Sequence, residues 1–286
     1  MLIMNKSEKI MKYFIICIIL ILPCFVLAQD GGKAGLIVTP TRVVLEGKQR
    51  SKLISIANNG TAKGKYRISV INKTMTKRGL IENAEEPIGS ELFANDLIRF
   101  SPRSVTLKPG EHQNIRLMVR KNKDMQDGEY RSHMNFMILP DEEISQQDTQ
   151  EKNKQNKSDN SLTISIKSNF GVSIPVIIRH GNLDATAIIE GISITHKGDN
   201  KYVNFSILRE GSKSLYGDLL FYFVKEGNSK LIKSVGGIAI YTSIERRNLE
   251  IPIDLEAQKG KLLIEYRQKP EDGGELITAS EVNIDS

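Results

Sequence analysis

Apolar and polar residues alternate along an unusually long stretch, SLTISIKSNFGVSIPVIIRHG at residues 161–181. Its even-numbered positions are apolar with one interruption at Ser168; they are Leu162, Ile164, Ile166, Phe170, Val172, Ile174 and Val176. Successive side chains of a strand point to opposite faces, so the pattern predicts one continuous apolar stripe. At ~3.3 Å per residue the stripe is about 50 Å long, whereas an ordinary strand measures roughly 17–20 Å. The length of this strand exceeds what one sheet requires.

Shorter alternating runs, separated by turn residues such as NNG at 58–60 and KPGE at 108–111, recur from residue 36 onward. Those before residue 181 predict an antiparallel sandwich. A second set follows it: GISIT, YVNFSIL, DLLFYFV, GGIAIYTSI, NLEIPIDL, GKLLIEY and ITASEVNI. We therefore expect an all-β chain with two sandwich domains in tandem, residues 29–181 and 182–286.

One segment has neither a strand pattern nor a turn signature. Residues 141–161, DEEISQQDTQEKNKQNKSDNS, are almost wholly polar and charged. Such a composition cannot bury enough apolar surface to become ordered, so we expect a mobile loop that leads into the long strand.

The chain begins with the features of a secretory signal peptide. Three lysines precede the apolar run YFIICIILILPCFVLA, which ends in Val26-Leu27-Ala28. The run has about 16 residues and is shorter than the ~20 that a membrane-spanning helix needs. We expect cleavage after Ala28, so that residues 1–28 are removed; an uncleaved anchor is the alternative, and Met11 could equally be the start of the signal.

Cleavage would remove Cys17 and Cys24, the only two cysteines of the sequence. The mature chain would then have no disulfide, no thiolate nucleophile and no cysteine metal site. It would keep 37 basic and 33 acidic residues, a formal charge of +4, because three lysines and one glutamate leave with the signal. This charge is too small to indicate a nucleic-acid partner. We expect no association with a membrane after cleavage.

The sequence contains no recognisable catalytic or metal-binding motif. Its four histidines lie far apart and match no paired-ligand spacing; they are His112, His133, His180 and His196. No phosphate-binding glycine loop or GxSxG turn is present, and Gly236-Gly237 lies within an apolar strand run, where it predicts a β-bulge. We therefore expect no enzyme activity, no metal and no cofactor.

Several stretches together resemble the periplasmic pilus-assembly chaperones of the chaperone-usher pathway, the PapD-like family. They span nearly all of the mature chain and are GLIVTPTRVVLEG (35–47), ISIANNGTAKGKYRISV (54–70), IRFSPRSVTLKPGEHQNIRLMV (98–119), DGEYRSHMNFMILP (127–140), the alternating run, and SLYGDLLFYF near 215–223. The resemblance implies two immunoglobulin-like domains in a boomerang arrangement with a cleft between them. It also implies a non-catalytic role, with pilus or fimbrial subunits and an outer-membrane usher as partners.

In this family, the chaperone lends part of its last first-domain strand to a subunit that lacks one, which is a form of strand addition. The resemblance thus assigns the excess length of the stripe to a partner's core, with Leu162, Ile164, Ile166 and Phe170 as donor residues. We expect residues 172–176 to be the buried face of the chaperone's own sandwich. Pro175 suits a strand edge, because proline has no N–H to donate to a ladder.

The family also holds the subunit's terminal carboxylate with two basic residues in the cleft. Arg42, in the PTRV stretch, matches the first of these, and a guanidinium can bind a carboxylate through two hydrogen bonds. The second is usually a lysine in the long strand, but Pro175 stands near that position here. Lys167 is the candidate that the sequence offers.

The resemblance implies a periplasmic chaperone that binds subunits by donor-strand complementation and delivers them to the usher. A secreted or surface structural protein built of tandem sandwiches is the alternative. A sandwich enzyme acting on polysaccharide would need paired carboxylates in a groove, and the sequence indicates no such pair.

Overall fold

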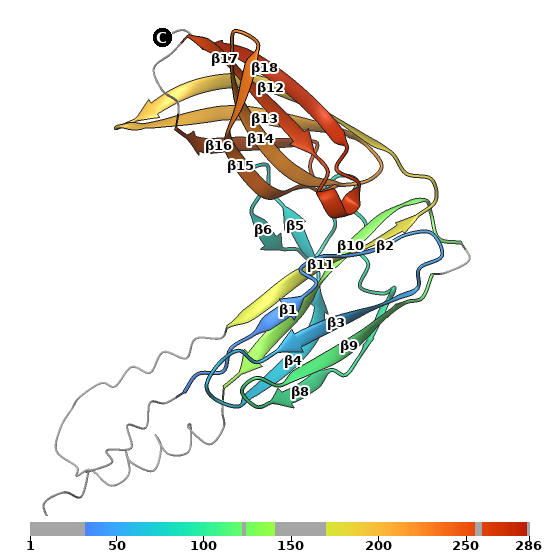
Figure 1. Ribbon diagram of the computed structural model, residues 1–286. Coiled ribbons are helices and arrows are strands. Elements are labelled where there is room, and N and C mark those ends of the chain that lie inside the picture. Colours follow the sequence, from blue (N-terminus) through green and yellow to red (C-terminus); the bar gives the residue numbers. More distant parts are fainter. Residues whose placement is uncertain (1–31, 122–123, 141–169, 255–258, 285–286) are drawn as a thin grey trace, which may run out of the picture.

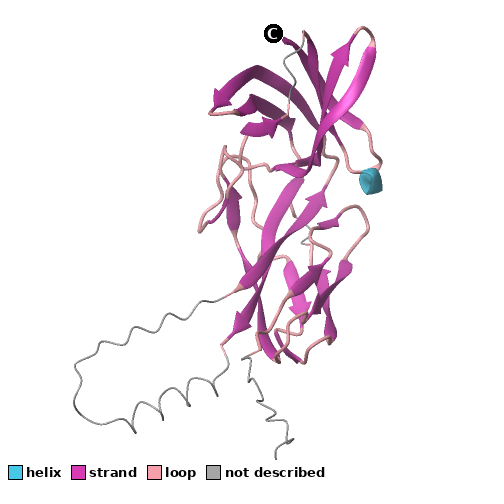
Figure 2. Ribbon diagram, turned by 60° about the vertical axis from the view of Figure 1, so that its left-hand side comes forward, coloured by secondary structure: helices cyan, strands magenta, loops and turns pink. Residues whose placement is uncertain are grey.

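The computed structural model describes residues 32–121, 124–140, 170–254 and 259–284. The described strands form two groups of sheets, one above the other in Figure 1, and strands dominate the fold in Figure 2. The change from the first group to the second falls at residues 181–184. The helix that the described residues contain is one 3-10 turn, η1 (Pro270–Asp272), and no helix among them is long and apolar enough to cross a membrane.

The first domain is a sandwich of two mainly antiparallel sheets with a small hairpin attached. One sheet has the order β1-β3-β9-β7, the other β2-β11-β10-β4-β8, and β5 pairs with β6. The strands are β1 (Ile37–Thr39), β2 (Val43–Leu45), β3 (Ser51–Ala57), β4 (Gly64–Ile71), β5 (Lys73–Met75), β6 (Ile81–Asn83), β7 (Ile98–Ser101), β8 (Ser104–Leu107), β9 (His112–Val119), β10 (Gly128–Leu139) and β11 (Gly171–His180).

The second domain repeats this two-layer plan with sheets β12-β13-β16 and β15-β14-β17-β18. Its strands are β12 (Ala185–Lys197), β13 (Asn200–Gly211), β14 (Leu215–Lys225), β15 (Asn228–Ile240), β16 (Arg246–Ile253), β17 (Gly260–Arg267) and β18 (Leu276–Ile284). Each of the predicted second-domain runs overlaps one of these strands, although GGIAIYTSI and NLEIPIDL continue past the ends of β15 and β16. The predicted bulge is confirmed, because the β14–β15 register shifts where Gly236-Gly237 faces Asp218.

Alternation along the strands builds the first core. In β9 and β11, every second side chain faces inward, as shown by the buried Ile115, Leu117, Ile174 and Val176. Val172 packs against the same core, whereas Phe170, two residues earlier and on the same face, is 67% exposed. The apolar stripe therefore leaves its own sandwich between residues 172 and 170.

The chain crosses from one sheet of the first domain to the other between β1 and β2. Strand β1 pairs with β3, while β2 runs parallel to β11 with Val43 opposite Val176. Because Arg42 directly precedes β2, this crossing places it at the end of the β2–β11 pairing.

The β5–β6 hairpin extends from the first domain onto the second. Met75, beside the turn of this hairpin, is buried within the second domain's hydrophobic cluster, and its N–H donates to Ser243 Oγ at 3.3 Å. The N–H of Asn248 in turn donates to the Lys77 carbonyl at 2.8 Å. Apolar packing and hydrogen bonds thus both join the two domains.

The prediction of an all-β chain with two immunoglobulin-like sandwiches is confirmed. The boomerang arrangement stays a prediction. The expected signal peptide, residues 1–28, and the expected mobile loop, 141–161, lie outside the described residues.

Candidate functional site: a basic cavity and an open strand edge

Arg42 reaches from the first domain to three residues of the second. Its Nη1 donates to Tyr241 Oη at 3.3 Å and its Nη2 to Ser214 Oγ at 3.5 Å. Its guanidinium carbon also lies 4.4 Å from the ring centroid of Tyr216. These partners are neutral and the two hydrogen bonds are long, so the half-buried Arg42 keeps an uncompensated charge within the contacts described here.

Tyr241 is shared with a second arginine, Arg131 of β10. The Arg131 guanidinium carbon is 3.9 Å from the Tyr241 ring centroid, and the Arg42 carbon is 5.7 Å from it. Arg131 is fully buried and forms an ion pair with the equally buried Glu91. Burial, together with the nearby charge of Arg42, lowers the pKa of Arg131 to about 10. Arg131 therefore remains a cation at neutral pH, compensated inside the protein.

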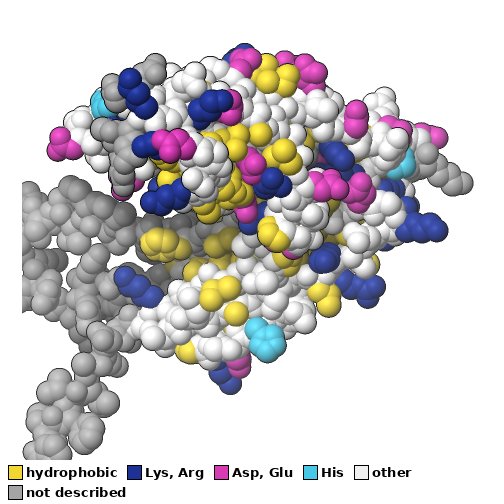
Figure 3. All heavy atoms as spheres, turned by 45° about the horizontal axis from the view of Figure 1, so that its top comes forward, with side chains coloured by type: hydrophobic (Ala, Val, Ile, Leu, Met, Phe, Trp, Pro, Cys, Tyr) yellow, Lys and Arg dark blue, Asp and Glu magenta, His cyan; other side chains and the backbone are white. Residues whose placement is uncertain are grey.

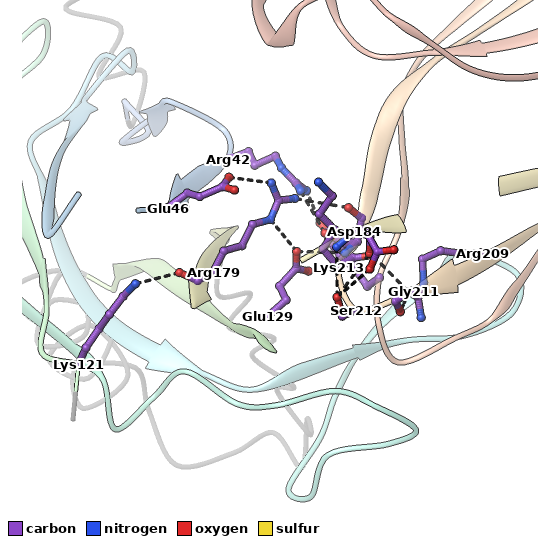
Figure 4. Close-up of polar contacts among 12 residues, drawn as sticks. Arg42, Glu46, Lys121, Glu129, Arg179, Asp184, Arg209, Gly211, Ser212 and Lys213 are labelled. Carbon is purple, nitrogen blue, oxygen red and sulfur yellow. Dashed lines mark hydrogen bonds and ion pairs between the residues drawn. The ribbon is translucent and has the colours of Figure 1, made fainter. Parts of the chain in front are cut away.

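A third arginine, Arg179 at the end of β11, connects the domains through carboxylates. Its Nε lies 3.0 Å from the buried Glu129 Oε2, and its Nη1 lies 3.2 Å from Glu46 Oε2. Glu129 Oε2 also accepts the Ser214 N–H at 3.0 Å, and the Ser214 carbonyl accepts from Arg179 Nη2 at 3.4 Å. This network fixes Ser214 of the second domain against β10 and β11 of the first. Figure 4 shows Arg179 between Glu46 and Glu129.

A cavity of about 510 Å³ opens beside these contacts, between the two domains. We call it the basic cavity; its lining residues are Arg42, Val44, Glu46, Gly47, Gln49, Arg179, Lys213, Ser214, Leu215, Tyr216, Gln268, Asp272 and Ile277. Figure 3 shows the surface hollowed between the two sandwiches, with hydrophobic side chains gathered in the hollow. The cavity combines cations with apolar walls, which favours an anionic group attached to an apolar chain.

A second feature of the site is the unpaired edge of β11. Along the whole of β11, one edge pairs with β10, but on the other edge β2 pairs with residues 176–178 alone. Residues 171–175 have no strand on that side among the described residues; we call them the open edge. Natural proteins seldom leave such an edge bare, because it is a template for another strand.

The structure describes two of the site residues predicted from the sequence, and the others lie outside the described residues. Arg42 lies in the basic cavity, and Phe170 lies exposed just before the open edge. Lys167, Leu162, Ile164 and Ile166 fall outside the described residues, so their predicted roles stay predictions.

Sequence reasoning missed the second domain's share of the cavity. Ser214, Tyr216 and Tyr241 contact Arg42 across 172, 174 and 199 residues of sequence. No local pattern marks residues brought together at such separation. The SLYG stretch carried the resemblance near 215–223 and was the one available signal.

The comparisons with known proteins identify the family. The sequence profile described as pili and flagellar-assembly chaperone, PapD N-terminal domain, matches residues 35–179, which is half of the chain. The chain belongs to this family. A search of curated proteins finds no match.

Among solved structures, the chain is similar to one described as a chaperone–tip adhesin complex of CFA/I fimbriae biogenesis, at 14% identity and a TM-score of 0.43, covering 87% of this chain and 98% of that one. It is also similar to the Acinetobacter baumannii CsuC–CsuE complex of chaperone and tip subunit from archaic Csu pili, at 13% identity, TM-score 0.43 and coverages of 88% and 99%. A third is the Pseudomonas aeruginosa CupB2 chaperone, at 11% identity, TM-score 0.41 and coverages of 87% and 100%.

Proposed function

We propose that this chaperone holds a fimbrial subunit along the open edge of β11, with the subunit's terminal carboxylate at Arg42, and passes it to an outer-membrane usher. The observation that carries the proposal is the continuity of the two features. Val43 is opposite Val176, so Arg42 stands where the β2 pairing ends and the open edge begins. One extended peptide can therefore occupy the edge and reach the guanidinium.

The backbone alternation of β11 defines which groups an incoming strand can use. Ile138 N–H donates to the Phe170 carbonyl, and the β10–β11 register has no break, so even-numbered residues of β11 direct their backbone groups to β10. Gly171 and Ser173 consequently direct theirs to the open edge. Pro175, the next in this series, has no N–H to offer. The hydrogen-bond ladder between β11 and the incoming strand therefore has fewer bonds at Pro175, next to the point where the carboxylate is bound.

The same geometry gives the direction of the incoming strand. Its C-terminus must meet Arg42, at the end of the open edge next to residue 176. It therefore runs from Gly171 toward Pro175, parallel to β11 and in line with β2. Parallel pairing is somewhat weaker per residue than antiparallel pairing, so apolar donor side chains contribute an essential part of the affinity.

Those donor side chains are Phe170 and, preceding it, Leu162, Ile164 and Ile166. Phe170 supports this assignment because it is largely exposed while lying on the same face as the partly buried Val172 and the buried Ile174. An apolar side chain left in water at an open strand edge is a binding or aggregation surface. In the subunit's groove it would be buried.

The remaining parts of the proposal concern place and organisation. The chaperone acts in the periplasm after removal of residues 1–28, as a mature chain with domains 29–181 and 182–286 and the loop 141–161 before the donor stretch. Its work is binding, without catalysis and without a cofactor. We expect its gene to neighbour genes for an usher and for subunits.

The test is capture of a subunit by a donor-strand variant. Phe170→Asp should abolish co-purification of the tagged chaperone with fimbrial subunits encoded beside its gene, because a charge would have to enter the subunit's core. Its own melting curve should not change, since Phe170 is exposed.

Leu53→Asp is the matched control, because Leu53 is a similarly exposed apolar residue of the other sheet, with 58% of its surface accessible. It should capture subunits normally. Equal capture by wild type and Phe170→Asp would remove Phe170 from the donor strand, and failure of every form, wild type included, to bind any subunit would reject the proposed function.

A further inference from the structure

The short connection between β13 and β14, residues 212–214, carries Lys213 to the wall of the basic cavity. Its backbone is fixed on both sides of this lysine. The Lys213 N–H donates to the Asp184 carbonyl at 3.3 Å, and the Lys213 carbonyl accepts from Nη1 of the buried Arg209 at 3.2 Å. The next residue, Ser214, is bound to Glu129. The loop that carries Lys213 is therefore held in place by backbone hydrogen bonds on both sides of this residue.

The side chain of Lys213 has no comparable partner. Within the described ranges, its ammonium group takes part in no hydrogen bond and no ion pair, although the residue is half-buried. A lysine with its backbone held and its ammonium group uncompensated beside a cavity is suited to binding an anion from outside.

The charges around the cavity favour the same interpretation. Arg179 is paired with two carboxylates, Glu129 and Glu46, so it offers no free positive charge to a ligand. Arg42 and Lys213 have no acidic partner in the described chain. Asp272 also lines the cavity and weakens its positive potential. The lining residues carry three cations and two carboxylates, a net charge of +1, and the two cations without a described acidic partner are the ones open to a ligand carboxylate.

We propose that Lys213 is the second cation of the carboxylate site, acting together with Arg42 from the opposite domain. This inference rests on the proposed function and deepens it. Arg42 comes from the first domain and Lys213 from the second, and both lie at the domain junction in Figure 4. The first-domain strand β11 offers Pro175, which has no charge, next to the register position of Arg42. The second cation is supplied across the cleft instead.

A carboxylate site with Arg42 in one domain and Lys213 in the other has a consequence for specificity. A terminal carboxylate would meet both cations, whereas a side-chain carboxylate along the strand would leave the edge ladder to reach them. The site would therefore read the end of a chain, and its affinity would depend on the two domains keeping their relative position. The junction contacts of Ser214 with Glu129 and Arg42 hold that position.

The experiment compares a peptide acid with its amide on the full mature chaperone. The probe is a fluorescein-labelled octapeptide of alternating serine and valine ending in a free carboxylate, and the reference is the same peptide as a C-terminal amide; anisotropy gives both affinities. Wild type should prefer the acid. Lys213→Gln should reduce this preference about tenfold, the scale of losing one charge-assisted hydrogen bond. Lys213→Arg should retain most of it, and Lys225→Gln, at the far end of β14, should retain all of it.

The variants separate this inference from the proposed function. A preference that falls in Arg42→Ala but not in Lys213→Gln would leave the carboxylate site standing and overturn the role of Lys213. The absence of any acid preference in wild type would overturn both. An unchanged melting curve of Lys213→Gln is part of the expected result, because the ammonium group makes no described contact; a lowered melting temperature accompanied by equal loss of acid and amide binding would mean that Lys213 is structural and would overturn its role in the site.

Discussion

Arg42 and Arg131 both lie close to the ring of the same residue, Tyr241, yet they have opposite surroundings. Arg131 is fully buried and ion-paired with Glu91. Arg42 is half-buried at the edge of the basic cavity, and its described hydrogen-bond partners are hydroxyl groups. Both residues belong to the first domain, and both contact Tyr241 of the second.

The difference separates a structural cation from one available to a partner. A buried charge without a counter-charge would destabilise the fold, so Arg131 requires Glu91. Arg42 needs no internal carboxylate because the open cavity keeps it near water. We call the buried Arg131–Glu91 pair the closed side of the junction and Arg42, at the basic cavity, its open side. The closed side helps to hold the two domains together, and the open side leaves a cation for a ligand.

The largest effect is expected on the closed side. Glu91→Ala should lower the free energy of unfolding by about 3–5 kcal/mol, because Arg131 would remain buried and unpaired. Chemical denaturation measures this loss of unfolding free energy. Replacing both partners, Glu91→Leu with Arg131→Met, should recover most of the loss. A single substitution costing less than about 1 kcal/mol would show that water reaches Arg131 and would remove the contrast with Arg42.

On the open side, the main effect should be on binding. Arg42→Ala should weaken subunit capture by about 2–5 kcal/mol, because the subunit's buried carboxylate would lose its partner. The free chaperone should lose less than about 1 kcal/mol of stability, since the two hydrogen bonds of Arg42 are long and its stacking on Tyr216 is only half-buried. Arg103→Ala is the control, as Arg103 also stacks on an aromatic ring, Phe100, at 5.1 Å. Normal capture by Arg42→Ala would exclude Arg42 from the site.

Acidification should weaken the closed side through His133, two residues beyond Arg131 on β10. Burial, followed by the charges of Arg131 and Lys73, lowers the pKa of His133 to about 3. A histidine with a depressed folded pKa contributes stability that is complete above the unfolded value of about 6.5 and is lost as the pH falls below it. At pH 5 the loss should be about 2 kcal/mol.

Unfolding measured at pH 7 and pH 5 tests this dependence, with His133→Gln as the variant that cannot titrate. The difference between the two pH values should shrink by about 2 kcal/mol in the variant. An identical pH dependence in both proteins would mean that His133 stays accessible to protons in the folded state.

The sequence predicted the strands better than the site, for a physical reason. Alternation is local, so pairs such as Ile54 and Ile56 revealed a buried strand face, and Gly236-Gly237 revealed a bulge. The cavity depends on residues as distant as Arg42 and Tyr241, which the fold alone brings together. Arg42 was found because a motif resembled a family.

Neither Arg131 nor Lys213 carried any comparable signal. The run EYRSHMNF does not distinguish a buried, ion-paired arginine from a solvated strand arginine, because the distinction depends on Glu91, forty residues away. Lys213 lies in SKSLYG, where a lysine in a polar turn is ordinary. Its missing counter-charge becomes visible only when its three-dimensional neighbours are known.

The smallest effect should come from the hydroxyl of Tyr241, and it tests whether the two arginines near this ring are independent. Tyr241→Phe removes the acceptor of the 3.3 Å bond from Arg42 but keeps the ring that covers Arg131 at 3.9 Å. The free energy of unfolding should fall by no more than about 1 kcal/mol, the usual net value of one hydrogen bond. Subunit affinity should drop by less than in Arg42→Ala, because the guanidinium remains and only its orientation loosens.

Tyr241→Ala, by contrast, should destabilise the fold and weaken capture together, since it uncovers both arginines. A loss in Tyr241→Phe as large as that in Glu91→Ala would mean that the hydroxyl supports the buried pair, and the closed and open sides of the junction would then be one coupled unit.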